Sequence, residues 1–188
     1  MIASMLRVLV AAVLAAATAG SVRVPNLDGT PVDPLQPNAA TKATVLLFVS
    51  TDCPISNRYA PDVQKLHQTY ARSGVAFWLV YPNPVESVVD IRDHLKSFSY
   101  PGTALRDPKH DLVKTAGATI TPEAAVFDAK GILTYRGRID DRYSAIGIEK
   151  AQATRHDLED AIAATLAGKA ATQKFTQAVG CYIADFLK

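Results

Sequence analysis

Cysteine is scarce in this chain, since only Cys53 and Cys181 occur among 188 residues. Two cysteines are too few for a disulfide-dense scaffold or for a zinc site of four cysteines. A charge excess is also missing, because 20 basic residues face 18 acidic ones. A nearly neutral chain lacks the basic surface that nucleic acids attract, so we expect no nucleic-acid partner. The two cysteines can form one disulfide, or supply one reactive thiol and a partner.

Long apolar runs are also missing, apart from ten residues, 8–17, that follow Arg7. A membrane span needs about 20 apolar residues, so this run is too short to be an anchor. With the small residues Ala17-Thr18-Ala19 behind it, the run predicts a signal peptide at residues 1–19. We therefore expect a protein exported to the periplasm or the extracellular space, with no stable membrane insertion after cleavage. A disulfide can persist in those compartments.

What remains divides into a proline-rich, loop-like segment, residues 20–42, and one folded domain, residues 43–188. Continuous apolar runs at 45–49 and 75–81 are typical of strands buried on both faces. An amphipathic pattern at 58–72 predicts a helix between them. Strand, helix and strand in this order indicate a parallel pair joined by a crossover.

The second half of the domain predicts further helices and a hairpin. Asn83 as N-cap, Pro84 in the first turn and Glu86 three residues after the cap predict the start of a helix. The remaining elements are a short helix that ends at Gly117, hairpin strands at 124–127 and 132–138, and a helix that opens at Thr154. In the second hairpin strand, we expect Leu133, Tyr135 and Ile139 to share a face. These elements predict an α/β fold, a mixed sheet with helices on both faces.

Cys53 has the position that best explains chemistry. It follows the first predicted strand and, with Pro54, opens the first helix, where the helix dipole and free N–H groups favour a thiolate. Asp52 opposes that effect, whereas Arg58 would support it. The alternative is a buried structural thiol, the usual state of a free cysteine. A second feature, Thr121-Pro122, stands directly before the hairpin.

These residues carry a resemblance to the thioredoxin-fold superfamily, within the redoxin (AhpC/TSA-like) group of exported bacterial proteins. The matching pieces, spread over residues 43–183, are Asp52-Cys53-Pro54, Thr121-Pro122, Phe127-Asp128-Ala129-Lys130-Gly131, Tyr135-Arg136-Gly137-Arg138-Ile139-Asp140-Asp141 and Val179-Gly180-Cys181. The last two resemble a peroxiredoxin-like subgroup. The resemblance implies a thioredoxin-like fold in which Pro122 is cis and faces Cys53.

The departures from these families are equally informative. Thioredoxins carry Cys-x-x-Cys, and here Ser56 replaces the second cysteine, while Leu47 replaces a buried acid. The peroxiredoxin motif Pro-x-x-x-Thr-x-x-Cys would place its proline at Leu46 and its threonine at Ser50. Peroxiredoxins do not usually have the cis-proline dipeptide. The site is therefore closer to a thioredoxin with a single active-site thiol.

Cys181 lies far along the chain, past the last predicted helix, and three roles stay open for it. It can resolve a mixed disulfide or sulfenate at Cys53, form a permanent disulfide with Cys53, or never meet Cys53. The resemblance also raises the prospect that Arg138 or Asp141 lies near the thiol, although a solvated charged loop is the simpler interpretation. The four histidines show no metal-ligand spacing. We expect no metal, and we expect His110 and His156 to be exposed.

The sequence thus predicts an exported thiol–disulfide oxidoreductase in which Cys53 is the nucleophile and Cys181, or an external thiol, resolves the intermediate. Ser50, Asp52, Pro54, Ser56, Thr121, Pro122 and Arg138 are the expected supporting residues. The expected partners are protein thiols or disulfides, or a peroxide, as substrate, and an external thiol reductant; no cofactor is expected. One alternative is a peroxiredoxin-like thiol peroxidase. Another is a binding or copper-handling module with a structural Cys53–Cys181 disulfide.

Overall fold

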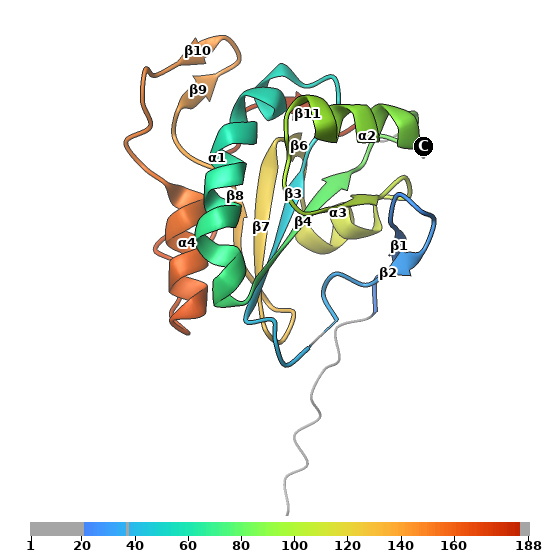
Figure 1. Cartoon of the computed structure of the whole chain (residues 1–188). Coiled ribbons are helices and arrows are strands. Elements are labelled where there is room, and N and C mark those ends of the chain that lie inside the picture. The colour runs from blue at the N-terminus through green and yellow to red at the C-terminus, as the bar shows by residue number, and fades with distance from the viewer. Residues whose placement is uncertain (1–20, 37, 185–188) are drawn as a thin grey trace, which may run out of the picture.

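The computed structural model describes residues 21–36 and 38–184 and is built on a five-stranded sheet of order β5-β4-β3-β7-β8 (Figure 1). Three strands are parallel: β3 (Ala43–Phe48), β4 (Val75–Tyr81) and β5 (Thr103–Arg106). β7 (Glu123–Asp128) is antiparallel to β3, and β8 (Leu133–Gly137) is antiparallel to β7. The predicted mixed sheet, parallel crossover and hairpin are confirmed. The strand β5 was not predicted.

Helices cover both faces of this sheet. The buried side chains of α1 (Pro54–Tyr70), α2 (Val88–Ser97) and α4 (Asp157–Leu166) belong to one core cluster. Those of α3 (Asp111–Ala116) belong to the cluster on the other side. A 3-10 turn, Ala71–Ser73, follows α1. The α/β, thioredoxin-like architecture predicted from the sequence is therefore confirmed.

The central strand β3 shows why an apolar run forms a strand between two layers. All six of its residues are buried. Ala43, Val45 and Leu47 pack in the cluster that contains α1 and α4, whereas Leu46 and Phe48 pack in the cluster that contains α3. Successive side chains of a strand point to opposite faces, so a strand covered on both sides must be apolar at every position.

Three short strand pairs decorate the central sheet. β1 (Val24–Pro25) and β2 (Pro31–Val32) form a hairpin in the segment predicted to be loop-like, and Val24 is buried against the α3 side of the core. β9 (Tyr143–Ala145) and β10 (Ile148–Glu149) form a hairpin that projects beside α1 (Figure 1). The third pair, β6 (Ile120–Thr121) with β11 (Cys181–Tyr182), joins the C-terminal tail to the centre of the protein.

Two helices begin later than the sequence predicts. The N-cap of α2 is Ser87, which forms a reciprocal capping box with Asp90, so Asn83 and Glu86 lie before the helix. His156 is the N-cap of α4, because the Thr154 hydroxyl donates to Asp141 instead of capping a helix. In both places a nearby side chain offered a competing hydrogen bond.

The shared face predicted for the second hairpin strand is wrong for one residue. The register between β7 and β8 shifts between Val126 and Phe127. Tyr135 and Ile139 therefore pack with the α1 cluster, whereas Leu133 packs with the α3 cluster. Within the described part of the chain, no helix is long and apolar enough to cross a membrane. The predicted signal peptide lies outside the described residues.

Candidate active site

Cys53 is the N-cap of α1, and Pro54 occupies the first helical position. The Asn57 N–H donates to the Cys53 carbonyl oxygen at 3.1 Å, which starts the helix, and the Cys53 N–H donates to Ser50 O at 3.3 Å. The first N–H groups of a helix have no partner within the helix, and its dipole is positive at this end. The side chain of Cys53 thus lies where a thiolate is stabilised, and it is fully buried.

The Thr121–Pro122 peptide bond is cis, as the resemblance implies. The Cys53 thiol donates a hydrogen bond to the carbonyl oxygen of Thr121 at 3.0 Å. The start of α1 and the strand β6 therefore meet at the sulfur atom of Cys53.

Cys181 is brought to the same place by the pairing of β11 with β6, in which it lies opposite Thr121. Thr121 Oγ1 donates to the Cys181 carbonyl oxygen at 3.4 Å, and the Ile183 N–H donates to Thr119 O at 3.0 Å. Both cysteines are free thiols in this structure, and the Cys181 side chain lies close enough to the Cys53 sulfur to lower its pKa. The arrangement in which the two cysteines never meet is therefore wrong.

Gly180 allows this close approach. A Cβ atom at position 180 would lie 2.0 Å from the carbonyl oxygen of Thr121, much closer than van der Waals contact permits. Only glycine fits between β11 and β6 here, and the residue after it is Cys181. The glycine of the motif Val179-Gly180-Cys181 is thus required for steric reasons, which the sequence alone did not indicate.

The two thiols have opposite electrostatic environments. Burial by itself raises the pKa of Cys53, but hydrogen bonds from the Cys181 thiol, from Ser56 and from backbone N–H groups outweigh it and lower the pKa. For Cys181, whose residue is exposed but whose sulfur is partly desolvated, this desolvation, the hydrogen bond with Cys53 and the negative charge of Asp52 raise the pKa to about 12. Of the two thiols, Cys53 therefore ionises first as the pH rises, and Cys181 keeps its proton to higher pH.

Ser56 and Arg58 differ in what they contribute to Cys53. The Ser56 hydroxyl is buried and has no hydrogen-bond partner among the described residues, yet it lies close enough to the Cys53 sulfur to lower its pKa. An unsatisfied hydroxyl gains an acceptor when the thiol ionises. Arg58 instead pairs with Glu149 at 2.6 Å on the surface, so its predicted support for the thiolate is absent.

Glu86, which the sequence predicted to cap a helix, instead contacts the loop that leads to Cys53. Its Oε1 atom accepts hydrogen bonds from the Ser50 hydroxyl at 2.9 Å and from the Thr51 N–H at 2.6 Å, in the loop that leads to Cys53. The side chain is buried, and burial raises its pKa. The adjacent Ser87 and Asp90 form a second capping pattern in the sequence. This pattern is the signal from which one could have predicted that Glu86 does not cap the helix.

Two pockets meet at Cys181. One, of about 230 Å³, is lined by Ser50, Asp52, Thr121, Cys181 and Tyr182, among others. The other, of about 290 Å³, is more apolar and lies between the start of α1 and the β9–β10 hairpin, with Ile55, Tyr143, Ile146 and Cys181 in its wall. A molecule that reaches the thiols can therefore contact a polar pocket on one side and an apolar one on the other.

Comparison with known proteins decides the family, because the model of the AhpC/TSA family matches residues 16–136. The chain belongs to the AhpC/TSA family. Among solved structures, it is similar to an uncharacterized conserved protein from Geobacillus kaustophilus, with 24% identity, coverage of 91% of this chain and 92% of that one, and a TM-score of 0.77. A hypothetical protein from Sinorhizobium meliloti is similar at 25% identity, with 91% and 94% coverage and a TM-score of 0.73.

A secreted Mycobacterium tuberculosis disulfide oxidoreductase homologous to Escherichia coli DsbE shares the fold at 18% identity. That alignment covers 79% of this chain and 96% of the other, with a TM-score of 0.53. None of the curated proteins compared matches the chain in sequence.

Compared with the peroxiredoxin motif Pro-x-x-x-Thr-x-x-Cys, this chain retains the cysteine and a hydroxyl group at the threonine position, but it lacks the proline. Ser50 stands at the threonine position, but its hydroxyl bonds to the carboxyl groups of Asp52 and Glu86. The proline position is Leu46, inside β3 and buried on the α3 side of the sheet. The surroundings of Cys53 are thus a cis-proline, a second thiol and two carboxyl groups.

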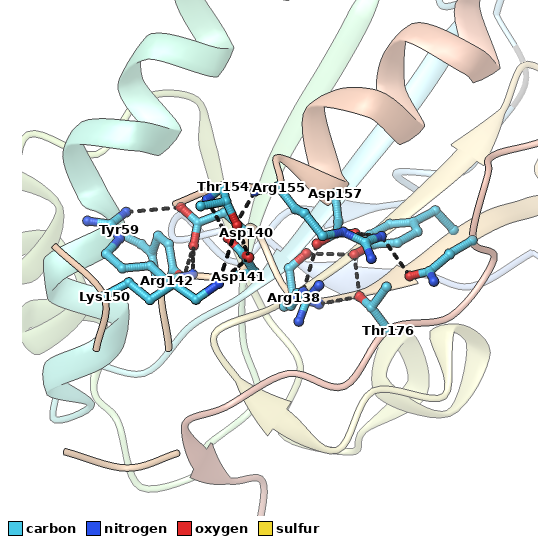
Figure 2. A network of polar contacts seen from close by, with 12 residues as sticks. Tyr59, Arg138, Asp140, Asp141, Arg142, Lys150, Thr154, Arg155, Asp157 and Thr176 are labelled. Atoms are coloured by element: carbon cyan, nitrogen blue, oxygen red, sulfur yellow. Dashed lines mark hydrogen bonds and ion pairs between the residues drawn. The ribbon is translucent and has the colours of Figure 1, made fainter. Parts of the chain in front are cut away.

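Arg138 belongs to a different network of this AhpC/TSA protein (Figure 2). Its Nε atom donates to the buried Asp157 of α4 at 2.7 Å, and its N–H donates to Thr176 Oγ1 at 3.1 Å. Asp141 accepts from Lys150 and Thr154, in the loop before α4. None of these contacts involves a cysteine, so the structure places Arg138 and Asp141 in the joint between β8, α4 and the tail.

The histidines lie apart from the thiols. His110, which we expected to be exposed, is buried and has Nε2 3.0 Å from Pro82 O, whereas His156 is exposed as predicted. His67 packs edge-on against Phe77. Among the residues that the structure describes, no group of three or more His, Cys, Asp and Glu side chains is placed to hold a metal ion.

Proposed function

We propose that this protein is an exported thiol–disulfide oxidoreductase in which Cys53 is the nucleophile and Cys181 is the resolving thiol. The observation that carries the proposal is that both cysteines meet at Thr121, which bonds to the Cys53 thiol and pairs with Cys181, while the pKa of Cys53 is lowered and that of Cys181 raised. The thiol with the lower pKa is the better candidate for the attacking nucleophile, and the neighbouring thiol with the higher pKa is protonated until it reacts in the second step. Membership of the AhpC/TSA family supports a redox role.

The reaction proceeds by two exchanges of sulfur partners. The Cys53 thiolate attacks one sulfur of a substrate disulfide, a mixed disulfide forms, and the first substrate sulfur leaves as a thiolate. Cys181 then loses its proton and attacks the Cys53 sulfur, which releases the second substrate thiolate. The protein ends with a Cys53–Cys181 disulfide, and two electrons and two protons have passed to the substrate. An external thiol reductant restores the dithiol, and no cofactor takes part.

Access to Cys53 depends on the tail. Cys53 is fully buried, whereas Cys181 is exposed and lies between two pockets. β11 has only two residues and is paired with a strand of two residues. A substrate sulfur therefore reaches Cys53 when β11 separates from β6, and the second exchange takes place when it returns.

Export remains part of this proposal. It rests on the signal peptide predicted at residues 1–19, ahead of the segment 20–42 and the domain 43–188. The secreted Mycobacterium tuberculosis disulfide oxidoreductase with the same fold supports it. In an oxidising compartment the partners are proteins that carry thiols or disulfides.

Trapping the mixed disulfide tests the proposal. The mature wild-type protein and the variants Cys53→Ser and Cys181→Ser are mixed in reduced form with a disulfide-bonded peptide, and the products are identified by intact mass. We expect Cys181→Ser to accumulate a peptide adduct on Cys53, wild type to convert to an internal disulfide, and Cys53→Ser to do neither. A wild-type protein that stays reduced, or an adduct found on Cys181, would contradict it.

A thiol peroxidase is the second candidate, and the family match is the observation in its favour. The same Cys181→Ser variant separates the two, because a peroxidase would form a sulfenate at Cys53 with hydrogen peroxide faster than a peptide adduct. Dimedone labelling of Cys53 measures the sulfenate. We expect the peptide adduct to form faster, since the Ser50 hydroxyl is engaged by two carboxyl groups.

A further inference from the structure

Ser50 stands between two carboxyl groups in the loop before Cys53. Its Oγ atom is 2.5 Å from Asp52 Oδ1 and 2.9 Å from Glu86 Oε1. A hydroxyl has a single hydrogen, so it can donate to only one of two carboxylates. Both contacts are hydrogen bonds only if one carboxyl carries a proton and donates it to Ser50. The geometry thus describes two carboxyl groups that share one proton through a serine.

The buried end of this chain of contacts is Glu86. Its Oε1 atom also accepts from the Thr51 N–H and from Thr51 Oγ1 at 2.9 Å. Its Oε2 atom is buried and has no partner among the described residues. A buried carboxylate oxygen without a donor is costly, and that cost falls when the carboxyl group binds a proton at Oε1 and loses its charge. Glu86 is therefore a ready place for a proton, and burial raises its pKa.

The exposed end is Asp52, which lines the same pocket as Cys181. The negative charge of Asp52 raises the pKa of Cys181 and also that of Glu86, so the three groups act on one another. Two further groups face Glu86 from neighbouring strands. The Arg106 guanidinium donates to the main-chain oxygen of Glu86 at 3.0 Å. The other group is Tyr81, whose pKa is raised by burial and, to a smaller extent, by the negative charges of Tyr100 and Glu86.

We propose that Asp52, Ser50 and Glu86 act together as the acceptor of the proton that Cys181 releases when it resolves the mixed disulfide. In that step Cys181 passes its proton to the carboxyl pair, its sulfur bonds to Cys53, and the bond from Cys53 to the substrate sulfur breaks. The substrate thiolate leaves with the electron pair, and the proton returns through the pocket to it or to water.

The electrostatics favour such a transfer. Partial burial and the hydrogen bond with Cys53 raise the pKa of the Cys181 thiol, and the negative charge of Asp52 adds to that rise by opposing a second negative charge. If the proton moves to the carboxyl pair as the thiolate forms, that opposing charge is neutralised in the same step. Ser50 lets the proton be held at either carboxyl, one exposed and one buried.

This inference rests on the proposed Cys53–Cys181 couple. Stopped-flow kinetics with the aromatic disulfide DTNB distinguishes a failure of the proton acceptor from a failure of the couple. The first thionitrobenzoate is released in a phase that depends on DTNB concentration, which reports attack by Cys53. The second is released in a concentration-independent phase, which reports resolution by Cys181. The variants are Asp52→Asn, Glu86→Gln and Ser50→Ala, with Asp93→Asn on the exposed side of α2 as the matched control. Circular dichroism checks that each is folded.

We expect Asp52→Asn, Glu86→Gln and Ser50→Ala to slow the second phase by at least about tenfold near pH 7, with the slowing reduced as the pH rises. Asp93→Asn should behave as wild type. Charge alone would have the opposite effect, because removing a negative charge lowers the pKa of Cys181 and speeds the second phase. A second phase that is unchanged or faster in all three variants overturns the inference and leaves the couple intact. A wild-type protein without a second phase overturns both.

Discussion

At the scale of single residues, the lowered pKa of Cys53 depends on hydrogen-bond donors that its own helix and the tail supply. Burial works against ionisation, so the pKa of Cys53 is lowered only because the Cys181 thiol, Ser56 and backbone N–H groups outweigh the effect of burial. Ser56 is the simplest of these to remove, since its hydroxyl has no other partner among the described residues. It occupies the position at which thioredoxins carry their second cysteine.

We therefore predict that Ser56→Ala raises the pKa of Cys53 by up to about one unit, because one hydrogen bond to the charged form is lost. The rate of alkylation of Cys53 against pH, measured in the Cys181→Ser background, gives the pKa directly. Ser97→Ala on α2, an exposed position, is the control. A pKa that stays the same or falls in Ser56→Ala would contradict the role of this hydroxyl.

Sequence reasoning found the residues whose type and position carry chemistry by themselves. Cys53 and Thr121-Pro122 stand next to predicted elements, and the structure brings them within one hydrogen bond. Glu86 and His110 were misjudged because their side chains turn inward from loops, toward partners on other elements. Local pattern describes the face that a helix or strand residue takes, but it contains no information on where a loop side chain points.

At the scale of elements, β6 and β11 make the site from segments that are remote in sequence. The register of this pair places Cys181 opposite Thr121, and Gly180 is the residue that lets the strands approach. A methyl group at position 180 would overlap the Thr121 carbonyl oxygen, so β11 would have to shift away from β6. The Cys181 thiol would then lose its hydrogen bond to Cys53.

We predict that Gly180→Ala slows the internal Cys53–Cys181 disulfide formation by about tenfold or more, because closing the pair then costs more than about 1.4 kcal/mol extra. The initial attack by Cys53 should be kept or accelerated, since the tail covers it less tightly. Mass-resolved quenching of the reaction with a disulfide-bonded peptide measures both steps. Tyr182→Ala, at a side chain that is 83% exposed, is the control. Resolution at the wild-type rate would show that β11 does not position Cys181.

The helices and strands that could be predicted are those whose burial requires a recognisable apolar pattern in the sequence. β3, β4 and the hairpin are apolar because they are covered on both faces, and their runs are visible without a structure. The four-residue strand β5 is too short to give a pattern, and two of its residues are buried. The starts of α2 and α4 depended on which of two polar residues caps the helix, a choice that packing decides.

At the scale of the whole molecule, the chain after α4 returns across the sheet to deliver Cys181. Lys174 and Thr176 bond to the main chain of Arg136 in β8, and Thr176 Oγ1 lies 2.6 Å from the Tyr135 hydroxyl. The Arg138–Asp157 ion pair ties the same region to α4 (Figure 2). The tail is thus fixed to β8 before it reaches β6, a path that the sequence could not predict because its contacts are long-range and polar.

Because Cys53 and Cys181 are so far apart in sequence, the stability of the oxidised protein tests whether a Cys53–Cys181 disulfide is catalytic or structural. In a chain-entropy model, joining residues so far apart stabilises the fold by roughly 5 kcal/mol when the bond is unstrained and the reduced state gains nothing of its own. Here the reduced state does gain, because the lowered pKa of Cys53 stabilises its thiolate above that pKa. Stabilising the reduced form makes the disulfide easier to reduce.

We therefore predict that oxidation adds clearly less than about 5 kcal/mol to the free energy of unfolding near pH 8, and that the gain grows as the pH falls through the pKa of Cys53. The gain on oxidation grows at lower pH because protonation of Cys53 removes the thiolate stabilisation from the reduced protein, whereas the oxidised protein has no thiol to protonate. Urea unfolding of oxidised and reduced protein at several pH values measures the difference, with Cys53→Ser as the control that has no disulfide. A gain near 5 kcal/mol that does not vary with pH would instead identify the bond as a permanent structural link.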